Sequence, residues 1–142
     1  MRVLLLLSLI FTPLCFAGHH SESKNDQIIF LLDLEVIEGK ENQVDDLIDR
    51  LVDNVKKTEP GTIAYEYYAS SKDRIFLYEV YENHAAAEFH VDSFLQGDLM
   101  PIFVDTFRVV TFEVLGTTTD ELKLKMKDFT NDHRPKTKGF IR

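Results

Sequence analysis

The sequence predicts an α+β domain whose elements run strand, helix, strand, strand, helix, strand. Two runs rich in β-branched and aromatic residues, Thr62 to Ala69 and Arg74 to Tyr81, flank the polar segment Ser70 to Asp73, which is typical of an antiparallel hairpin. One helical pattern precedes this hairpin and another follows it, and an apolar strand borders each helix on its far side. A chain of 142 residues with 44% hydrophobic content has room for one core of ordinary size.

The first strand and helix lie before the hairpin. Ile28 to Val36 is apolar on both alternating faces for most of its length, which predicts a strand covered on both sides. Gly39-Lys40 then opens a helix that ends near Lys56-Lys57, where positive charge favours a helix C-terminus. Its apolar residues form one stripe, which predicts a surface helix laid across a sheet. The stripe consists of Val44, Leu47, Ile48, Leu51, Val52 and Val55.

The remaining elements are marked by turn and cap residues. Pro60-Gly61 predicts a turn, with glycine accepting the positive φ that a tight turn often needs. Asn83 can cap the helix that follows the hairpin. Gly97 to Thr106 is expected to form a shorter helical segment with Asp98 as its cap, and Phe107 to Leu115 the last strand.

The resulting order β-α-β-β-α-β is the ferredoxin-like split arrangement. Two helices cover only one face of such a sheet, yet the strands carry apolar side chains on both faces. In the first strand, Phe30 and Leu32 alternate with Ile29 and Leu31. A monomer would leave a large apolar surface in water. We therefore expect a homodimer in which two sheets pack face to face.

The N-terminus predicts export. Met1-Arg2 precedes an apolar run, and Cys15-Phe16-Ala17 places small residues where a signal peptidase reads them, so residues 1–17 are expected to be a signal peptide. The alternative is an uncleaved membrane anchor, but the run is shorter than the roughly 20 residues of a span, and Pro13 interrupts it. The mature, periplasmic or secreted protein would then have no membrane span. It would also have no thiol, because Cys15 is the only cysteine.

Two further segments flank the predicted domain, which occupies residues 28–116. Residues 18–27 read as a flexible linker, whose His19-His20 pair lacks a scaffold for a metal, so no metal site is expected. Residues 117–142 form a basic tail that is partly helical, because Thr118 to Glu121 resembles a capping box. Docking of this tail on a partner subunit and disorder both remain open.

The charge of the chain argues against nucleic acid as a partner. The formal net charge is −8, and the basic residues of the tail leave the body still more acidic. An acidic body repels phosphate backbones.

Several segments in order resemble the antibiotic biosynthesis monooxygenase (ABM) family. They are the turn Glu59-Pro60-Gly61, the strand segment Tyr65-Glu66-Tyr67, the strand Leu77 to Glu82 and the helix Ala86 to His90. The resemblance covers roughly residues 28–115 and implies a dimeric α/β barrel. Because this fold hosts several chemistries, the activity must be argued from the site.

Two branches of this fold differ in their fit to the chain. Haem-degrading relatives use an Asn, a Trp and a His at positions that here hold Leu32, Tyr81 and Met100, so haem degradation is not expected. The segment Tyr78 to Tyr81 resembles instead the signal-furanone isomerases, which are cytoplasmic and act on a phosphorylated substrate.

His90 and Glu79 are the predicted catalytic residues. Helical spacing places His90 with Ala86, Phe89, Ser93 and Phe94, facing the sheet. Alternation places Glu79 with Tyr81 on one strand face, among apolar neighbours where a carboxylate is costly unless it is paired. The alternatives are a structural histidine, and a structural salt bridge from Glu79 to a residue such as Arg108.

The predicted substrate-binding residues are aromatic: Tyr81, Tyr65, Tyr67 and Phe94. The sequence has no metal, flavin or nucleotide motif, so no cofactor is expected. These residues and the resemblance favour a cofactor-independent monooxygenase that acts on a quinol or a similar electron-rich aromatic. A non-catalytic small-molecule-binding or stress-related module of the same fold, or a furanone-type isomerase, are the alternatives.

Overall fold

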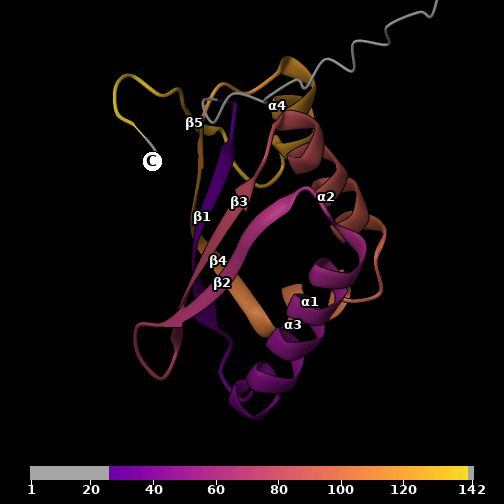
Figure 1. Ribbon diagram of the computed structural model, residues 1–142. Coiled ribbons are helices and arrows are strands. Elements are labelled where there is room, and N and C mark those ends of the chain that lie inside the picture. The colour runs from indigo at the N-terminus through magenta and orange to yellow at the C-terminus, as the bar shows by residue number, and fades with distance from the viewer. Residues whose placement is uncertain (1–25, 141–142) are drawn as a thin grey trace, which may run out of the picture.

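The computed structural model describes residues 26–140, which form one five-stranded sheet with helices packed against it (Figure 1). The sheet order is β2-β3-β1-β4-β5, and every pair of neighbours is antiparallel except β4 and β5. The predicted signal peptide and most of the linker lie outside the described residues. The strands are β1 (Ile28–Val36), β2 (Thr62–Ala69), β3 (Arg74–Tyr81), β4 (Phe107–Leu115) and β5 (Asp132–Arg134). The helices are η1 (Glu41–Gln43), α1 (Val44–Thr58), α2 (His84–Gln96), α3 (Met100–Thr106) and α4 (Asp120–Met126).

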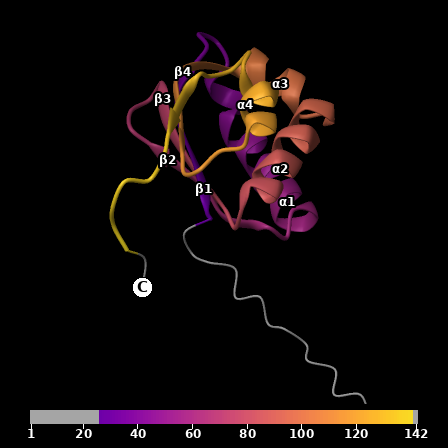
Figure 2. The same cartoon turned by 90° about the horizontal axis from the view of Figure 1, so that it is seen from above.

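All four α-helices lie on the same side of the sheet (Figure 2). The hydrophobic core lies between the sheet and this layer of helices. Along β1 every second side chain, from Ile28 to Val36, is buried on the helix side, and the residues between them are half-buried on the outer face. The predicted stripe of α1 meets this core: Val44, Leu47, Leu51 and Val55 are buried. No helix in the described part of the chain is long and apolar enough to span a membrane.

The predicted α+β order is confirmed, and the four main strands have the expected bounds. Asn83 caps α2 as predicted, because its side chain accepts a hydrogen bond from the backbone N–H of Ala86 at 3.0 Å. The predicted cap of the shorter helix is wrong. That helix begins at Met100 without a side-chain cap, and Pro101 stands in its first turn, where proline has no N–H for a cap to satisfy.

The tail packs on its own subunit. This arrangement differs from both alternatives considered for it, docking on a partner subunit and disorder. Thr119 caps α4 by accepting the N–H of Leu122 at 3.0 Å, and Leu122 and Met126 are buried. β5 then pairs in parallel with the end of β4, where Val114 lies opposite His133. The tail thus adds a helix and a strand to the domain.

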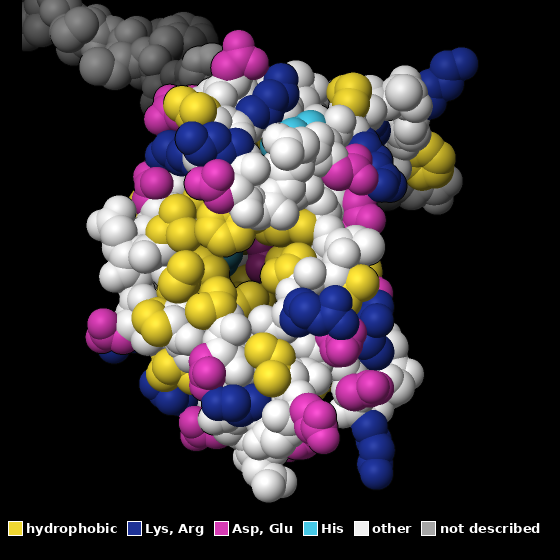
Figure 3. Space-filling model, turned by 180° about the vertical axis from the view of Figure 1, so that it is seen from behind, with side chains coloured by type: hydrophobic (Ala, Val, Ile, Leu, Met, Phe, Trp, Pro, Cys, Tyr) yellow, Lys and Arg dark blue, Asp and Glu magenta, His cyan; other side chains and the backbone are white. Residues whose placement is uncertain are grey.

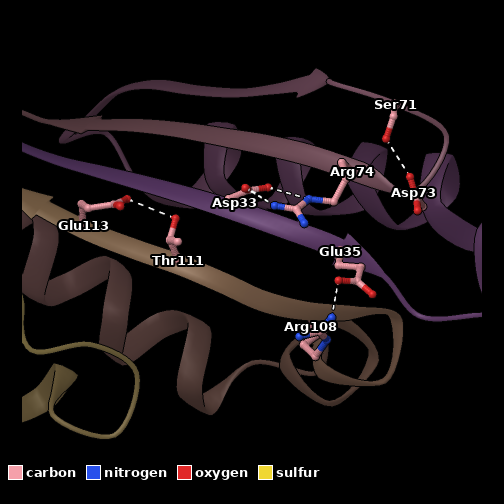
Figure 4. Close-up of polar contacts among 8 residues, drawn as sticks. All are labelled: Asp33, Glu35, Ser71, Asp73, Arg74, Arg108, Thr111 and Glu113. Atoms are coloured by element: carbon pink, nitrogen blue, oxygen red, sulfur yellow. Dashed lines mark hydrogen bonds and ion pairs between the residues drawn. The ribbon is translucent and has the colours of Figure 1, made fainter.

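The outer face of the sheet combines apolar and charged side chains. Figure 4 shows Arg74 paired with Asp33 and Arg108 paired with Glu35, on β3, β1 and β4. Arg108 therefore does not form the salt bridge considered for Glu79. No helix of the described chain covers this face, so the predicted homodimer remains the simplest way to shield its apolar part.

Candidate functional site

A cavity of about 90 Å³ lies between the inner face of the sheet and helices α2, α3 and α4. Figure 3 looks toward it: hydrophobic side chains surround a hollow, and a histidine and an acidic side chain are visible at its bottom. The ionisable side chains that line the cavity are His90, Glu79 and Tyr65. The apolar lining includes Phe30, Leu32 and Leu77 from the sheet and Phe94, Phe103 and Met126 from the helices.

His90 comes from the face of α2 that packs on the sheet, and it is 6% exposed. Its Nδ1 lies 2.8 Å from Oε2 of Glu59, and its Nε2 lies 3.8 Å from Oε2 of Glu79. The ring is stacked on Phe94, with centroids 6.3 Å apart. One residue of the predicted face is wrong, because Phe89 is 52% exposed. A helix turns by about 100° per residue, so a buried face centred on His90 directs Phe89 toward its edge.

Glu79 reaches the same place from β3. Alternation directs it inward together with Leu77 and Tyr81, and it is 3% exposed. The hydroxyl of Tyr81 donates a hydrogen bond of 2.5 Å to its Oε2. The predicted meeting of His90 with the Glu79–Tyr81 segment is therefore what the structure shows, whereas the chemical roles of these residues stay predictions.

Burial and charge act against each other on these two groups. Burial raises the pKa of Glu79, while the positive charge of His90 and the hydrogen bond from Tyr81 partly lower it. Burial lowers the pKa of His90, but the charge of Glu79 and the hydrogen bond to Glu59 outweigh burial, so that this pKa is raised above 6.5. Both groups hold protons more tightly in the fold than in water. Two neighbouring groups whose charges interact this strongly titrate as one unit.

The predicted aromatic residues separate into two groups. Tyr65 and Phe94 line the cavity. Tyr67 stands behind Tyr65, with the two hydroxyls 3.0 Å apart, and it does not line the cavity. Burial, first of all, raises the pKa of Tyr65 well above 10, so its hydroxyl stays protonated.

Tyr81 is 0% exposed and does not line the cavity, so its contact with substrate stays a prediction. Its ring packs edge-on against Phe30, and its hydroxyl is used by Glu79. Strand alternation predicted that Tyr81 points inward, but not that its side chain is completely buried.

Glu59 is the site residue that the sequence analysis missed. It directly follows α1 and is 5% exposed, and its Oε2 also accepts a hydrogen bond from Thr62 at 3.2 Å. Gly61 explains how it comes so close to α2, because a Cβ at this glycine would lie only 2.7 Å from the Cβ of Ala86. Gly61 is therefore needed for close approach and not for positive φ, which it does not have. The one feature of the sequence that could have pointed to Glu59 is its position as a charged residue directly before the Pro60-Gly61 turn.

The tail contributes to the cavity as well. Met126 and Phe129 line it, although they lie beyond the last strand of the predicted domain. Two contacts of 2.6 Å attach α4 to α2: the hydroxyl of Thr119 donates to Glu88, and Lys125 pairs with Asp92. The described residues contain no cluster of three or more His, Cys, Asp and Glu side chains arranged to hold a metal ion.

The family described as antibiotic biosynthesis monooxygenase matches residues 28–102, more than half of the chain. The chain belongs to the ABM family. This match includes Glu59, Glu79 and His90, but it ends before Phe103 and the other cavity residues that follow. A comparison with curated proteins gives no match.

Solved structures share the fold at low sequence identity. MupZ from Pseudomonas fluorescens has a TM-score of 0.74 at 18% identity, with 83% of this chain and 96% of that chain covered. Rv0793 from Mycobacterium tuberculosis has a TM-score of 0.55 at 17% identity, covering 66% of this chain and 97% of that one. A candidate antibiotic biosynthesis monooxygenase from Caulobacter crescentus CB15 has a TM-score of 0.53 at 18% identity, covering 68% and 93%. These similarities show the fold.

Proposed function

We propose that this protein is a cofactor-independent monooxygenase that acts on a quinol or a similar electron-rich aromatic. The observation that carries the proposal is the His90–Glu79 pair at the bottom of an otherwise apolar cavity. Buried ionisable pairs with perturbed pKa values are common at catalytic sites. Membership of the ABM family supports a monooxygenase-like or small-molecule-binding module, and the quinol is the finer step of the proposal.

In this proposal His90 is the base. Neutral His90 takes a phenolic proton of the substrate on Nε2, and the anion that results can give an electron to O₂. Glu79 sets the protonation state of the ring, and the apolar lining shields the intermediates from water. The quinol supplies all four electrons and ends as a hydroxylated quinone, while one atom of O₂ enters the ring and the other leaves as water. No external reductant is needed.

The size of the cavity limits what enters it. Its volume of about 90 Å³ is below the usual range for small-molecule sites, roughly 300–1,000 Å³. Val104, Val109 and Phe129 line the cavity and are 50%, 38% and 40% exposed, so they form an apolar mouth. We propose that one aromatic ring inserts beside Tyr65 and Phe94 and that the rest of the ligand lies against this mouth.

One observation favours the non-catalytic alternative. Both nitrogens of His90 face carboxylates of its own chain, which also describes a satisfied structural histidine. The furanone-type isomerase has less support, because Tyr81, which carried that resemblance, is buried.

Oxygen uptake with a panel of quinols tests the proposal. We expect His90→Gln to lower kcat by about 10²- to 10⁴-fold, the usual contribution of a positioned base. His84→Gln is the matched control, since His84 lies on the same helix with its side chain 51% exposed, 3.8 Å from Glu88. Wild type that binds the panel but consumes no oxygen with any member would favour the non-catalytic module.

A further inference from the structure

We infer that Glu59 is a positioning residue that fixes the ring tautomer of His90, so that Nε2 is the nitrogen that accepts a proton on the side of Glu79 and the cavity. The catalytic meaning of this inference rests on the proposed function. The arrangement itself rests on the contacts of the buried ring.

The two nitrogens of His90 meet carboxylates at different distances. Nδ1 is 2.8 Å from Glu59, a full hydrogen bond, whereas Nε2 is 3.8 Å from Glu79, beyond hydrogen-bond distance. An ionised carboxylate only accepts hydrogen bonds, so Nδ1 carries the proton that is donated to Glu59. In the neutral ring the lone pair is then on Nε2. The partner of one ring nitrogen thus decides the chemistry of the other.

Glu59 is held rigidly enough to do this. Its side chain is 3% exposed and that of His90 is 8% exposed, so water does not compete strongly for the bond. Thr62 donates to the same carboxylate oxygen at 3.2 Å. Gly61 holds the turn against α2, because any Cβ at this position would collide with Ala86.

Glu59 and Glu79 also have different surroundings. Glu59 lines a second hollow of about 270 Å³ between α1 and α2, whose border includes Arg50, Asn54 and Ser93. His90, Tyr65 and Phe94 line both this hollow and the apolar cavity, so the ring stands between them. Glu59 borders this hollow together with polar side chains, whereas Glu79 faces the apolar cavity. The two carboxylates therefore act differently on the ring: Glu59 holds Nδ1 through a hydrogen bond, whereas Glu79 acts on the cavity side through its charge.

The pKa of His90 depends on every charged or titratable group around the ring and around the carboxylate of Glu59. On the inner side these are His90 itself from α2, Tyr65 from β2, and Glu79 and Tyr81 from β3. Around the surface hollows that Glu59 lines they are Arg50 and Lys56 from α1, Glu82 after β3 and Asp98 after α2. Glu59 is the one acid among them within hydrogen-bond distance of the ring.

The first test uses the wild type. In ¹⁵N-histidine NMR, with the signals of His90 assigned by their loss in His90→Gln, the neutral ring should carry its proton on Nδ1. A neutral ring protonated on Nε2 would overturn the inference, and this measurement needs no variant of Glu59.

The second test compares Glu59→Gln with Glu59→Asp and with the control Glu82→Gln. Glu82 is exposed and lines, with Glu59 and Gly61, a surface hollow beside the turn, but the structure shows no hydrogen bond or ion pair between Glu82 and the ring of His90. Losing an opposite charge this close should lower the NMR titration midpoint of His90 by about one pH unit or more in Glu59→Gln. Glu59→Asp, which keeps the charge, should restore part of the shift, and Glu82→Gln should leave the midpoint in place. Equal midpoints in Glu59→Gln and Glu82→Gln would overturn the inference.

The two proposals fail in different ways. If the wild type consumes no oxygen but shows the expected tautomer and midpoints, the monooxygenase proposal fails and the positioning role of Glu59 stands. If the wild type is active and the pH profile of kcat is the same in Glu59→Gln and Glu82→Gln, the positioning role fails and the monooxygenase stands.

Discussion

Tyr81→Phe removes a single hydroxyl, which lies fully buried beside Glu79 and His90. That hydroxyl donates to Glu79 at 2.5 Å, and Tyr81 and Glu79 are 0% and 3% exposed. His90 does not replace the lost donor, because its Nε2 is 3.8 Å from the same oxygen. The phenyl ring retains the contact with Phe30, so packing changes little. A hydrogen bond to a charged group contributes about 1.5–3 kcal/mol, and we expect the free energy of unfolding to fall by this amount near neutral pH.

A second tyrosine provides an unusually close control. Tyr68 donates to Glu66 at 2.8 Å, also two residues away on one strand, but Tyr68 is 51% exposed. Water replaces its partner, so Tyr68→Phe should cost less than about 0.5 kcal/mol.

Urea unfolding at one fixed protein concentration measures both variants. Because burial raises the pKa of Glu79, this carboxyl is neutral in acid, where the loss in Tyr81→Phe should shrink to about 0.5–1.5 kcal/mol. Equal losses in the two variants at neutral pH would refute the reasoning.

The other predictions concern pH, assembly and processing. The pKa of His90 is raised above 6.5 in the fold, so the contribution of this side chain to stability is complete below pH 6.5 and is lost as the pH rises through the raised value. Urea titrations across this pH range should show the loss in wild type but not in His90→Gln. Oxygen uptake should rise over the same pH interval, because only the neutral ring is a base, and a profile that falls there would contradict the assignment. Light scattering should give the mass of two chains, and Leu31→Lys on the outer face of β1 should give one; a wild-type monomer at micromolar concentration would contradict the sheet-to-sheet dimer. Intact mass of material from the native host should correspond to a chain that begins at Gly18, whereas a retained Met1 would exclude the predicted cleavage.

Much of the fold follows from the composition of short segments and from periodicity in the sequence. A continuous apolar run predicted the strand from Ile28 to Val36, runs of β-branched and aromatic residues predicted the hairpin, and the stripe of α1 predicted which face of that helix is buried. Strand alternation, applied to Glu79, and helical spacing, applied to His90, predicted that their side chains point toward each other. Periodicity gives the direction of a side chain but not its depth, and the complete burial of Tyr81 could not be predicted from it.

The missing parts depend on contacts between distant segments. Glu59 meets His90 across 31 residues of sequence, and only the docking of the turn on α2 brings them together. β5 is three residues long and polar, so it has no strand pattern of its own and forms because β4 offers an unpaired edge. Neither contact can be predicted from residues that lie close together in the sequence.

The position of α4 separates the chemistry of the cavity from its shape. The ionisable residues at the bottom lie within residues 28–102, the segment shared with the ABM family, whereas Met126 and Phe129 come from a segment outside it. Mutations in that segment would change the volume of the cavity without replacing His90, Glu79 or Tyr65. The shape of the cavity and the chemistry proposed for its bottom therefore depend on different stretches of the chain.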